Sequence, residues 1–233
     1  MTGNDTMLIL KQYPLWENLT HQEYEQLEVS DNFKEIKEGE FVYFEAFLHN
    51  YIYFLKKGYI KLGYLDEKGN RMVKEVLGPG DFFGQVSLEK TNLQGEFAQA
   101  MKSSVSLCAF TLDHFNTLLF SRPEMAVRYS KLIGLRMKRF ENRLVNILQK
   151  DVKTRALLFL KQLLKEARSP QQISENEVRI DNYLTHEEIA QLIGTSRQTV
   201  TSIFNELRDE GVCIYSRRKI TFLKSGNKLL AEA

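Results

Sequence analysis

The stretch IGTSRQTVTSIFNELRDEG, from Ile193 to Gly211, combines side chains that could read the edges of nucleic-acid bases. If a helix begins after Ser196, apolar residues spaced by three, one and three positions gather on one side of it. The opposite side carries short hydrogen-bonding groups led by an arginine, whereas a solvated helix face usually carries Glu and Lys. Arg can form two hydrogen bonds to guanine and Gln two to adenine, while Thr and Ser hydroxyls suit phosphates or base edges. We therefore interpret the polar side as a DNA-reading face made by Arg197, Gln198, Thr201 and Ser202.

The segment YLTHEEIAQLIGTSRQTV, which overlaps this stretch, contains the element that must position the reading face. Thr185 can cap a helix, and Glu188 three residues later completes a capping box. Gly194 lies where a tight turn between two helices needs a residue able to adopt a positive φ angle. Ser196 can then cap the second helix. We therefore predict two helices joined by a glycine turn.

The segment GVCIYSRRKITFLK reads as a strand, a basic turn and a second strand. Two helices followed by such a hairpin form a winged helix-turn-helix, in which the second helix enters the major groove of DNA. An ordinary helical hairpin with a polar outer face is the alternative. The joint presence of caps, glycine, core spacing and wing favours the DNA-binding unit. The predicted DNA-binding residues are Thr185, Thr195, Ser196, Arg197, Gln198, Thr201, Ser202 and, in the wing, Arg217, Arg218 and Lys219.

A heptad spacing within residues 119–150 predicts a long helix that joins two chains. Apolar residues recur there at steps of four, three, four and three, which is the spacing of a coiled-coil contact. Leu132, Leu135, Val145 and Leu148 offer a second, less regular apolar side. The helix could be wholly buried in its own domain, or it could pack one side on the β-domain and the other on a twofold mate. The strict spacing favours the homodimer. The predicted dimer contacts are Ile133, Met137, Phe140, Leu144 and Ile147.

Short β-branched and aromatic runs, separated by glycine turns, dominate residues 33–112. This pattern is typical of an antiparallel sandwich or barrel. The segment YLDEKGNRMV predicts a hairpin in which Gly69 or Asn70 adopts the positive φ angle of the turn. Residues 15–28 read as a short helical region, and residues 168–178 read as a polar loop.

Charge is distributed unevenly along the 233 residues, although the net charge is only +2. Residues 1–118 contain 11 Lys/Arg and 17 Asp/Glu, residues 119–150 contain 8 and 2, and residues 151–233 contain 13 and 11. An acidic front and a basic rear favour a polyanionic partner at the rear.

Asp151 can cap a new helix where the heptad spacing stops, which marks a boundary. We therefore predict an α+β chain with a β-domain at 1–118, a dimerisation helix at 119–150 and a winged helix-turn-helix at 151–233.

Several functional classes find no support in the sequence. Cys108 and Cys213 lie far apart, which excludes a disulfide framework, a Cys-rich zinc site and an N-terminal iron–sulfur cluster. The four histidines lack ligand spacing, and no nucleophile–base pair or phosphate loop stands out, so we expect no metal, no cofactor and no enzymatic activity. No apolar run is long enough to span a bilayer and the N-terminus lacks a secretory pattern, so we expect a cytoplasmic protein without a membrane partner.

Four segments resemble, in order, the parts of the bacterial Crp/Fnr family, the regulators related to the cyclic AMP receptor protein and the fumarate–nitrate reductase regulator. GDFFGQVSL is similar to the family's β-roll signature, and the heptad helix lies where the family has its dimerisation helix. DVKTRALLFLKQL resembles the hinge and first helix of its DNA-binding domain, and LTHEEIAQLIGTSRQTVTSIFNELRDEGV resembles its recognition motif. The resemblance covers nearly the whole chain. It implies that the β-domain is an antiparallel β-roll, a jelly roll like those that bind cyclic nucleotides.

The residues that bind cyclic AMP in that family are not matched here. Cyclic-AMP-binding members carry a Gly-Glu pair followed by an Arg-Ser pair, whereas this chain has Gly84-Gln85 and no Arg or Lys in the later segment NLQGEFAQA. Glu96 in that segment would place a negative charge near the phosphate, which is strongly unfavourable. The family's adenine-binding Thr-Ser positions are Phe140 and Glu141. We therefore reject cyclic AMP as the effector.

Aromatic residues of the β-roll could line an apolar effector pocket, or they could form the ordinary core, which is the interpretation we favour. No residue indicates haem. The candidate pocket residues are Phe82, Phe83, Gly84, Gln85 and Phe97.

The sequence thus predicts a homodimer that binds palindromic double-stranded DNA under the control of an unidentified small-molecule effector. RNA polymerase would be a further partner if the protein is an activator. The main alternative is a ligand-binding or protein-interaction module with a vestigial DNA-binding domain, against which the intact reading face argues.

Overall fold

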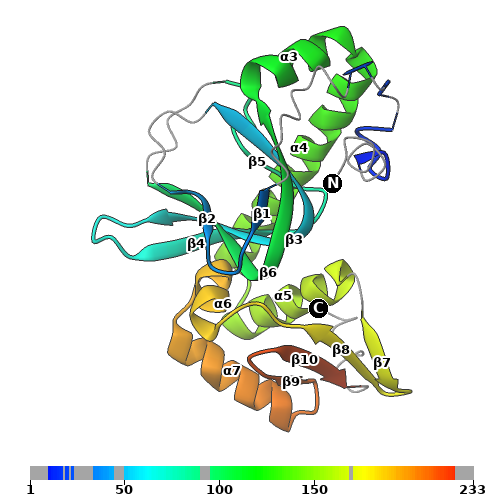
Figure 1. Ribbon diagram of the computed structural model, residues 1–233. Coiled ribbons are helices and arrows are strands. Elements are labelled where there is room, and N and C mark those ends of the chain that lie inside the picture. The colour runs from blue at the N-terminus through cyan, green and yellow to red at the C-terminus, as the bar shows by residue number, and fades with distance from the viewer. Residues whose placement is uncertain are drawn as a thin grey trace. The chain divides into compact units, whose positions relative to one another are not determined.

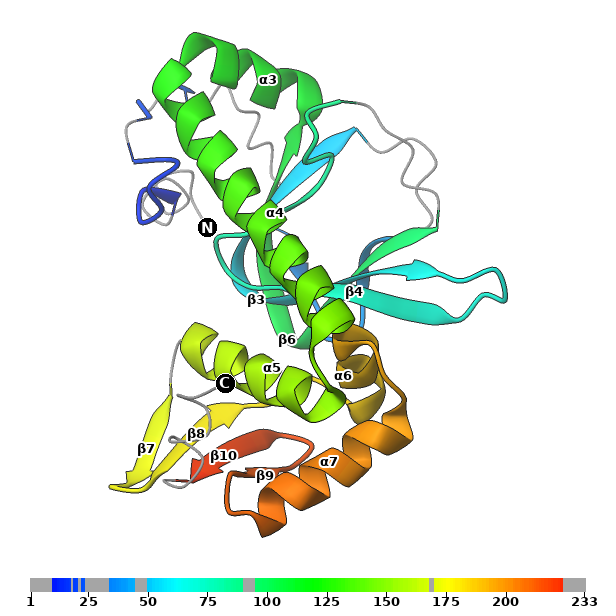
Figure 2. The ribbon, with the colours of Figure 1, turned by 180° about the vertical axis from the view of Figure 1, so that it is seen from behind.

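The computed structural model describes residues 10–17, 19–20, 22–23, 34–44, 50–89, 95–167 and 170–223, without the side chains of residues 102 and 103. The chain forms two compact units, Met1–Lys138 and Arg139–Ala233, and the long helix α4 (Pro123–Gln149) belongs to both. Figure 1 shows the elements of each unit, and Figure 2 shows them from behind. The boundaries expected at residues 118 and 150 differ from this division and stay predictions.

The N-terminal unit is built on an antiparallel sheet in the order β1-β6-β3-β4, with β2 paired to β6 and β5 paired to β3. The two long strands β3 and β6 pair along most of their lengths, as Figure 1 shows. Register shifts between Leu55 and Lys57 and between Lys57 and Tyr59 bend this pair, because an extra residue in one strand increases the local twist. The predicted antiparallel β-roll is therefore confirmed. Its strands are β1 (Lys34–Ile36), β2 (Phe41–Phe44), β3 (Tyr51–Leu65), β4 (Arg71–Leu77), β5 (Phe82–Gly84) and β6 (Glu96–Thr111).

Two clusters of buried side chains stabilise this unit. The first surrounds Trp16, whose ring centroid lies 5.5 Å from that of Phe54 and 5.2 Å from that of Phe110. Met125 and Tyr129 belong to the same cluster, so it anchors the first turns of α4 to the sheet. The second cluster includes Leu55, Ile60, Leu62, Leu77, Phe83 and Leu107.

The hairpin between β3 and β4 forms as predicted. Gly69 has a φ angle of 80°, and the Asp66 carboxylate accepts a hydrogen bond from the backbone N–H of Asn70 at 2.7 Å. Further along the pair, Gly63 is required for space, since an added Cβ would lie 2.2 Å from the backbone oxygen of Met72. A glycine there lets the two strands and the ring of Phe97 approach closely.

Helix α3 (Leu112–Ser121) follows β6 directly, and α4 begins after Arg122 with a proline, whose missing N–H costs nothing in a first turn. The helical part of the chain thus begins where the strand-rich region expected at residues 33–112 ends. Along α4, Tyr129 is buried and Ile133 packs against the first cluster. Although α4 has 27 residues, neither it nor any other described helix is long and apolar enough to cross a membrane.

The C-terminal unit combines three helices with an antiparallel sheet in the order β7-β8-β10-β9. Asp151 caps the first helix as predicted, because its carboxylate accepts a hydrogen bond from the N–H of Thr154 at 2.9 Å. Ala156, Leu157 and Leu160 of that helix are buried. The elements are α5 (Val152–Glu166), β7 (Gln171–Ser174), β8 (Glu177–Asp181), α6 (His186–Ile193), α7 (Arg197–Asp209), β9 (Cys213–Tyr215) and β10 (Lys219–Leu223).

The prediction of a polar loop at residues 168–178 is wrong for most of that segment. β7 and β8 form a hairpin in which Gln171 lies opposite Arg179. All four residues of β7 are exposed, so its sequence carries no apolar alternation that would indicate a strand. Residues 168–169 lie outside the described part. Of the helical region expected at residues 15–28, the structure describes turns up to residue 17 and helical backbone at 22–23, and residues 18, 21 and 24–28 also lie outside it.

Candidate functional site

Helices α6 and α7 meet at a turn whose geometry depends on Gly194. This residue has φ 70° and ψ 55°, in the left-handed region that glycine adopts without strain. The backbone N–H of Thr195 closes the turn by donating to the oxygen of Ala190 at 2.9 Å. The predicted helix–glycine turn–helix is confirmed.

Side-chain caps fix where both helices begin, and they use hydroxyl groups that we expected to contact DNA. Thr185 Oγ1 accepts from the N–H of Glu188 at 3.2 Å, and the Glu188 carboxylate accepts from the N–H of Thr185 at 2.7 Å. Ser196 Oγ accepts from the N–H of Thr199 at 3.1 Å and shares a hydrogen bond with the Thr199 hydroxyl. Thr195 is half-buried. The three predicted contacts Thr185, Thr195 and Ser196 thus have structural roles in the turn and caps, besides any contact with phosphate at the helix N-termini.

Helix α7 divides its side chains between the core and the surface as its sequence predicts. Val200, Ile203, Phe204 and Leu207 are buried. The four residues proposed to read bases are exposed on the other side, and they are Arg197, Gln198, Thr201 and Ser202.

Arginines from α4 and α5 brace the turn through backbone oxygens. Arg155 donates to the oxygen of Gly194 at 3.2 Å and to that of Ile147 at 3.0 Å. Arg143 donates to the oxygen of Gln191 at 3.2 Å. Because helix ends leave carbonyl groups without intrahelical partners, these bonds satisfy acceptors and fix the direction of α7.

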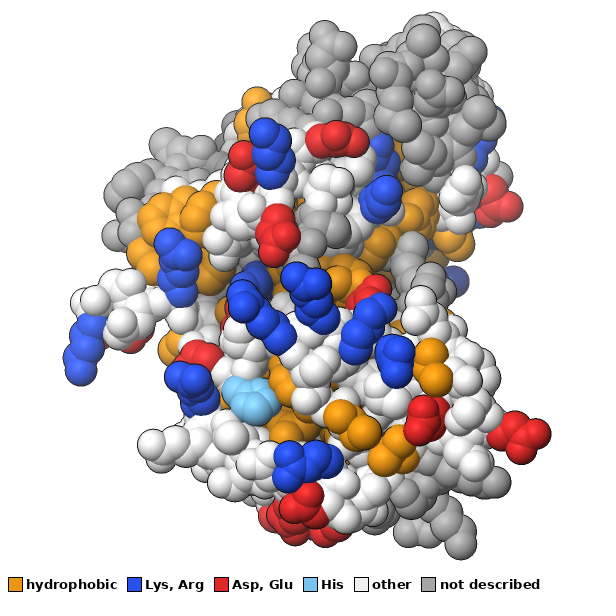
Figure 3. Space-filling model, turned by 60° about the horizontal axis from the view of Figure 1, so that its bottom comes forward, with side chains coloured by type: hydrophobic (Ala, Val, Ile, Leu, Met, Phe, Trp, Pro, Cys, Tyr) orange, Lys and Arg blue, Asp and Glu red, His pale blue; other side chains and the backbone are white. Residues whose placement is uncertain are grey.

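The wing joins β9 to β10 through a basic turn in which Arg217 and Arg218 are exposed. The backbone oxygen of Arg218 accepts from the N–H of buried Asn182 at 2.9 Å, which ties the wing to the end of β8. Lys219 lies in β10, and its Nζ is 2.7 Å from a carboxylate oxygen of Asp181. A carboxylate that close offsets the lysine charge, so Lys219 is less suited to phosphate than its two neighbours. Figure 3 shows a face of the molecule on which Lys and Arg side chains are exposed.

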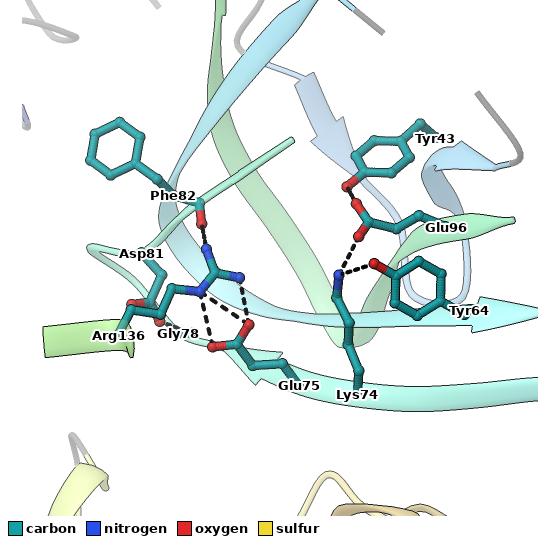
Figure 4. Close-up of polar contacts among 9 residues, drawn as sticks. All are labelled: Tyr43, Tyr64, Lys74, Glu75, Gly78, Asp81, Phe82, Glu96 and Arg136. Atoms are coloured by element: carbon teal, nitrogen blue, oxygen red, sulfur yellow. Dashed lines mark hydrogen bonds and ion pairs between the residues drawn. The ribbon is translucent and has the colours of Figure 1, made fainter. Parts of the chain in front are cut away.

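A cleft of about 270 Å³ lies in the β-roll and is lined in part by charged side chains (Figure 4). Lys74 of β4 pairs with Glu96 of β6 and donates to the hydroxyl of Tyr64 at 3.0 Å. The hydroxyl of Tyr43 donates to the other oxygen of Glu96 at 2.6 Å. Burial and the neighbouring Glu96 raise the pKa of Tyr43 above its ordinary value. Since Glu96 is only 3% exposed, these bonds offset the cost of removing its carboxylate from water.

A second ion pair in the cleft joins α4 to the sheet, as Figure 4 shows. The Nε of Arg136 lies 3.2 Å from both carboxylate oxygens of Glu75, and its Nη1 donates to the oxygen of Phe82 at 2.7 Å. The two charged side chains are 12% and 13% exposed. A guanidinium fork on a carboxylate fixes orientation as well as distance, so α4 is held against β4 and β5.

The residues expected to form an effector pocket do not all lie in this cleft. Phe83 and Gly84 line it. Phe82 and Phe97 are 4% and 1% exposed and pack against other rings, as expected for ordinary core. Gln85 is 1% exposed, and its backbone N–H donates to Tyr51. Their assignment to an effector site stays a prediction.

Sequence reasoning missed the two cations of the cleft, Lys74 and Arg136. It sought a cation only in the segment around Glu96, where the family places one. The available signals were weak: a charged pair inside the strand segment RMVKEVL and one of several basic residues in α4. Their meeting is decided by the packing of α4 on the sheet.

The five predicted dimer residues also differ in their surroundings. Met137 and Leu144 are 63% and 58% exposed, and Phe140 is 40% exposed. Ile133 instead packs against the core of the β-roll. Ile147 lies beside the α6–α7 turn, since a Cβ added to Gly194 would be 3.5 Å from its side chain. Part of the predicted contact row is therefore used within the chain itself.

The C-terminal unit has two helices joined by a glycine turn, a wing and an exposed polar helix face. Together with a β-roll on the same chain, these features define a DNA-binding transcription regulator that also has an effector-binding domain. Comparison with known families agrees with this class. Residues 154–227 match the Crp-like helix-turn-helix domain, and residues 33–122 match the cyclic nucleotide-binding domain. The chain is a member of the Crp/Fnr family of transcription regulators.

Curated relatives in this family are themselves regulators. The global nitrogen regulator of Nostoc sp. is 28% identical over 174 residues, which cover 74% of this chain and 77% of the relative. The CRP-like cAMP-activated global transcriptional regulator of Mycobacterium tuberculosis is 27% identical over 173 residues, covering 74% and 75%.

Solved structures share the fold. A CooA mutant from Carboxydothermus hydrogenoformans superposes with a TM-score of 0.67 at 22% identity, covering 85% of each chain. FixK2 from Bradyrhizobium japonicum gives a TM-score of 0.69 at 16% identity, covering 85% of this chain and 94% of its own.

Replacing Arg136 with Met should destabilise the N-terminal unit by about 3–5 kcal/mol, because it leaves the Glu75 carboxylate, which is only 13% exposed, without its cation. Adding Glu75→Gln removes that charge and should recover much of the loss, so the two changes should be strongly non-additive. Urea unfolding of the wild type, both single variants and the double variant measures the coupling.

The control is Arg128→Met, whose ion pair with Glu17 is more exposed and should contribute no more than about 1 kcal/mol. A coupling energy near zero between Arg136 and Glu75 would contradict the role given to this pair.

Proposed function

We propose that this protein is a homodimeric, sequence-specific transcription regulator whose two α7 helices bind the half-sites of a palindrome. The observation that carries the proposal is the exposed face of α7, where Arg197 and Gln198 lie in the first turn and Thr201 and Ser202 follow. Recognition helices contact bases with their N-terminal residues, and these side-chain types form the specific hydrogen bonds of the major groove. A vestigial DNA-binding domain would not be expected to keep this combination.

The wing would contact the phosphate backbone through Arg217 and Arg218. Both are exposed, and phosphate contacts by cations add affinity without sequence preference. Lys219 would contribute less, because Asp181 lies beside its ammonium group.

The dimer would form along an apolar row of α4 that is shifted from the row expected from sequence. Gly134, Met137, Glu141, Leu144 and Leu148 follow one another at steps of three, four, three and four. Met137, Leu144 and Leu148 are 63%, 58% and 74% exposed, and a Cβ added to Gly134 would meet nothing within 4 Å. Exposed apolar side chains in a heptad row are the pattern that a second helix covers. A polar residue such as Glu141 within the row would set register at a cost in stability.

A twofold axis along this row would relate the two α7 helices. Helix-turn-helix dimers place their recognition helices about 34 Å apart, one turn of DNA, and so read inverted repeats. RNA polymerase would be a further partner if the protein activates transcription.

The effector would act through the β-roll and would not be cyclic AMP. The carboxylate of Glu96 lies in the cleft, and both Lys74 and Arg136 already pair with carboxylates of the chain. A cyclic phosphate would therefore have to displace an internal ion pair before it gained a cation, which opposes binding. The cAMP activation named for the Mycobacterium tuberculosis relative is not carried over to this chain.

Regulation would be a shift in the population of dimers that hold the two recognition helices at the spacing of the half-sites. The pair between Arg136 and Glu75 supports α4 as the element that responds to the cleft, because it joins that helix to β4.

Binding-site selection with randomised DNA tests the proposed function. The wild type should select an inverted repeat with a guanine in each half-site, read by Arg197, and an A·T pair close by, read by Gln198. Gln198→Glu should move that pair towards C·G by about 1–3 kcal/mol, because a carboxylate only accepts hydrogen bonds and suits the amino group of cytosine.

Gln171→Glu in the exposed strand β7 is the control, since it makes the same change in charge away from α7. A wild type that selects no motif would refute the DNA-binding function, whereas identical motifs from wild type and Gln198→Glu would show that Gln198 does not contact a base.

Replacing both Met137 and Leu144 with Glu should dissociate the dimer, because four further carboxylates would join the two Glu141 carboxylates in the proposed contact row. Sedimentation velocity should show the mass of one chain, while circular dichroism stays that of the folded protein. Leu135→Glu is the matched control, because Leu135 is 65% exposed but lies outside the row. A dimer that survives the double change, or is lost with Leu135→Glu, would move the interface elsewhere.

Calorimetry with cyclic AMP and cyclic GMP should give no binding below about millimolar concentration. A dissociation constant of that size corresponds to a binding free energy of roughly −4 kcal/mol. The reason is that both cations of the cleft already have carboxylate partners. Micromolar affinity would show that a cyclic phosphate displaces one of these pairs.

A further inference from the structure

His186 lies at the start of α6, with its ring against α7 and β9. The ring stacks on Phe204 with centroids 5.5 Å apart and planes inclined by 15°, and its centroid lies 4.7 Å from that of Tyr215. Its Nε2 atom is buried and has no hydrogen-bond partner among the described residues. Its Nδ1 atom lies 2.8 Å from the hydroxyl of Thr201, a residue of the exposed face of α7.

The hydrogen bonds around Thr201 determine which ring nitrogen carries the proton. A threonine hydroxyl has one hydrogen, and Thr201 donates it to the backbone oxygen of Arg197 at 3.0 Å. The bond to His186 must therefore be donated by the ring, from Nδ1–H to the hydroxyl oxygen. In this tautomer the buried Nε2 is the unprotonated nitrogen.

We propose that His186 is a positioning residue for base recognition. It holds the Thr201 hydroxyl so that this group can accept a hydrogen bond from DNA but cannot donate one to it. The proposal rests on the DNA-binding function given above. Of the two lone pairs of the hydroxyl, one receives the ring N–H, and the only hydrogen is committed to Arg197. The remaining lone pair can accept a further hydrogen bond, and Thr201 is exposed.

An acceptor in the major groove has few partners. Only the amino groups of adenine and cytosine donate there, whereas N7 and O6 of guanine and O4 of thymine accept. Phosphate oxygens also only accept, so Thr201 is not a phosphate contact. At the base that it faces, Thr201 should therefore favour adenine or cytosine over guanine or thymine.

The surroundings of the ring favour the uncharged form of His186. Burial and the positive charge of Arg197 on α7 lower the pKa of His186 below its ordinary value. Tyr215 faces the ring from β9, and burial raises its pKa, with Glu188 on α6 acting in the same direction. Because the folded-state pKa of His186 is depressed, its contribution to stability is present above the unfolded pKa of about 6.5 and is lost as the pH falls through the folded-state value.

Binding-site selection with four proteins tests the proposal. They are the wild type, Thr201→Val, His186→Phe and His186→Asn. The wild type should enrich adenine or cytosine at one position of the half-site by roughly tenfold, the ratio that corresponds to 1.4 kcal/mol. Thr201→Val removes the hydroxyl and should abolish this preference. The position is exposed, so the fold is not at risk.

The two histidine variants separate positioning from packing. His186→Phe keeps an aromatic ring on Phe204 but has no N–H to hold the Thr201 side chain in the orientation in which its hydrogen reaches Arg197. The side chain can then turn and donate this hydrogen to DNA, so guanine or thymine should become accepted. His186→Asn loses the ring but offers an amide N–H close to the place of Nδ1, and it should retain the preference. His114→Phe in α3 is the control and should select the wild-type motif.

The outcomes distinguish this inference from the function on which it rests. A wild type that selects no motif refutes the DNA-binding function itself. A wild type that selects a motif, together with a Thr201→Val variant that selects the same one, overturns the acceptor role of Thr201. If Thr201→Val changes the motif but His186→Phe does not, the acceptor role does not depend on His186 and the positioning role is refuted.

Discussion

The left-handed backbone at Gly194 is the constraint on which the DNA-binding unit depends. A turn of this kind lets α7 leave α6 at once, so the apolar side of α7 meets the core and its polar side faces outwards. Arg155 reinforces the turn by bonding the oxygens of Gly194 and Ile147, and thereby links α7 to both α5 and the end of α4. The direction of the helix therefore decides that Arg197, Gln198, Thr201 and Ser202 are exposed.

In the β-roll, charged side chains that are largely removed from water are paired with one another. Lys74 and Glu96 form one pair and Arg136 and Glu75 the other, so each cation of the cleft has a carboxylate from the chain itself. Removing such groups from water is costly, and close pairing with further hydrogen bonds offsets that cost. A ligand that entered the cleft would compete with these pairs, and competition for Arg136 would be felt directly by α4.

Signals that act over a few residues were readable from the sequence. The capping box of Thr185 and Glu188, the cap at Asp151 and the turn at Gly69 all form as predicted, because each involves partners within about one helical turn or one hairpin loop. The alternating and helical periods identified most strands and helices for the same reason. The strand β7 was missed because all its residues are exposed, and an exposed strand needs no apolar alternation.

Apart from the hairpin of β7 and β8, the sequence by itself thus determined the order of the main elements, including the β-roll and the winged helix-turn-helix. It also determined the residue types on the outer face of α7, since spacing fixes which side chains share a face. The tertiary structure alone decided what those faces meet. It turned Ile133 of the expected contact row towards the core of the β-roll and left Met137 and Leu144 exposed, because a heptad gives the phase of an apolar row but not which neighbour covers it. It also brought Arg136 to Glu75 and His186 to Thr201, across 61 and 15 residues of chain. Such pairings depend on how distant elements pack, and no local period in the sequence records them.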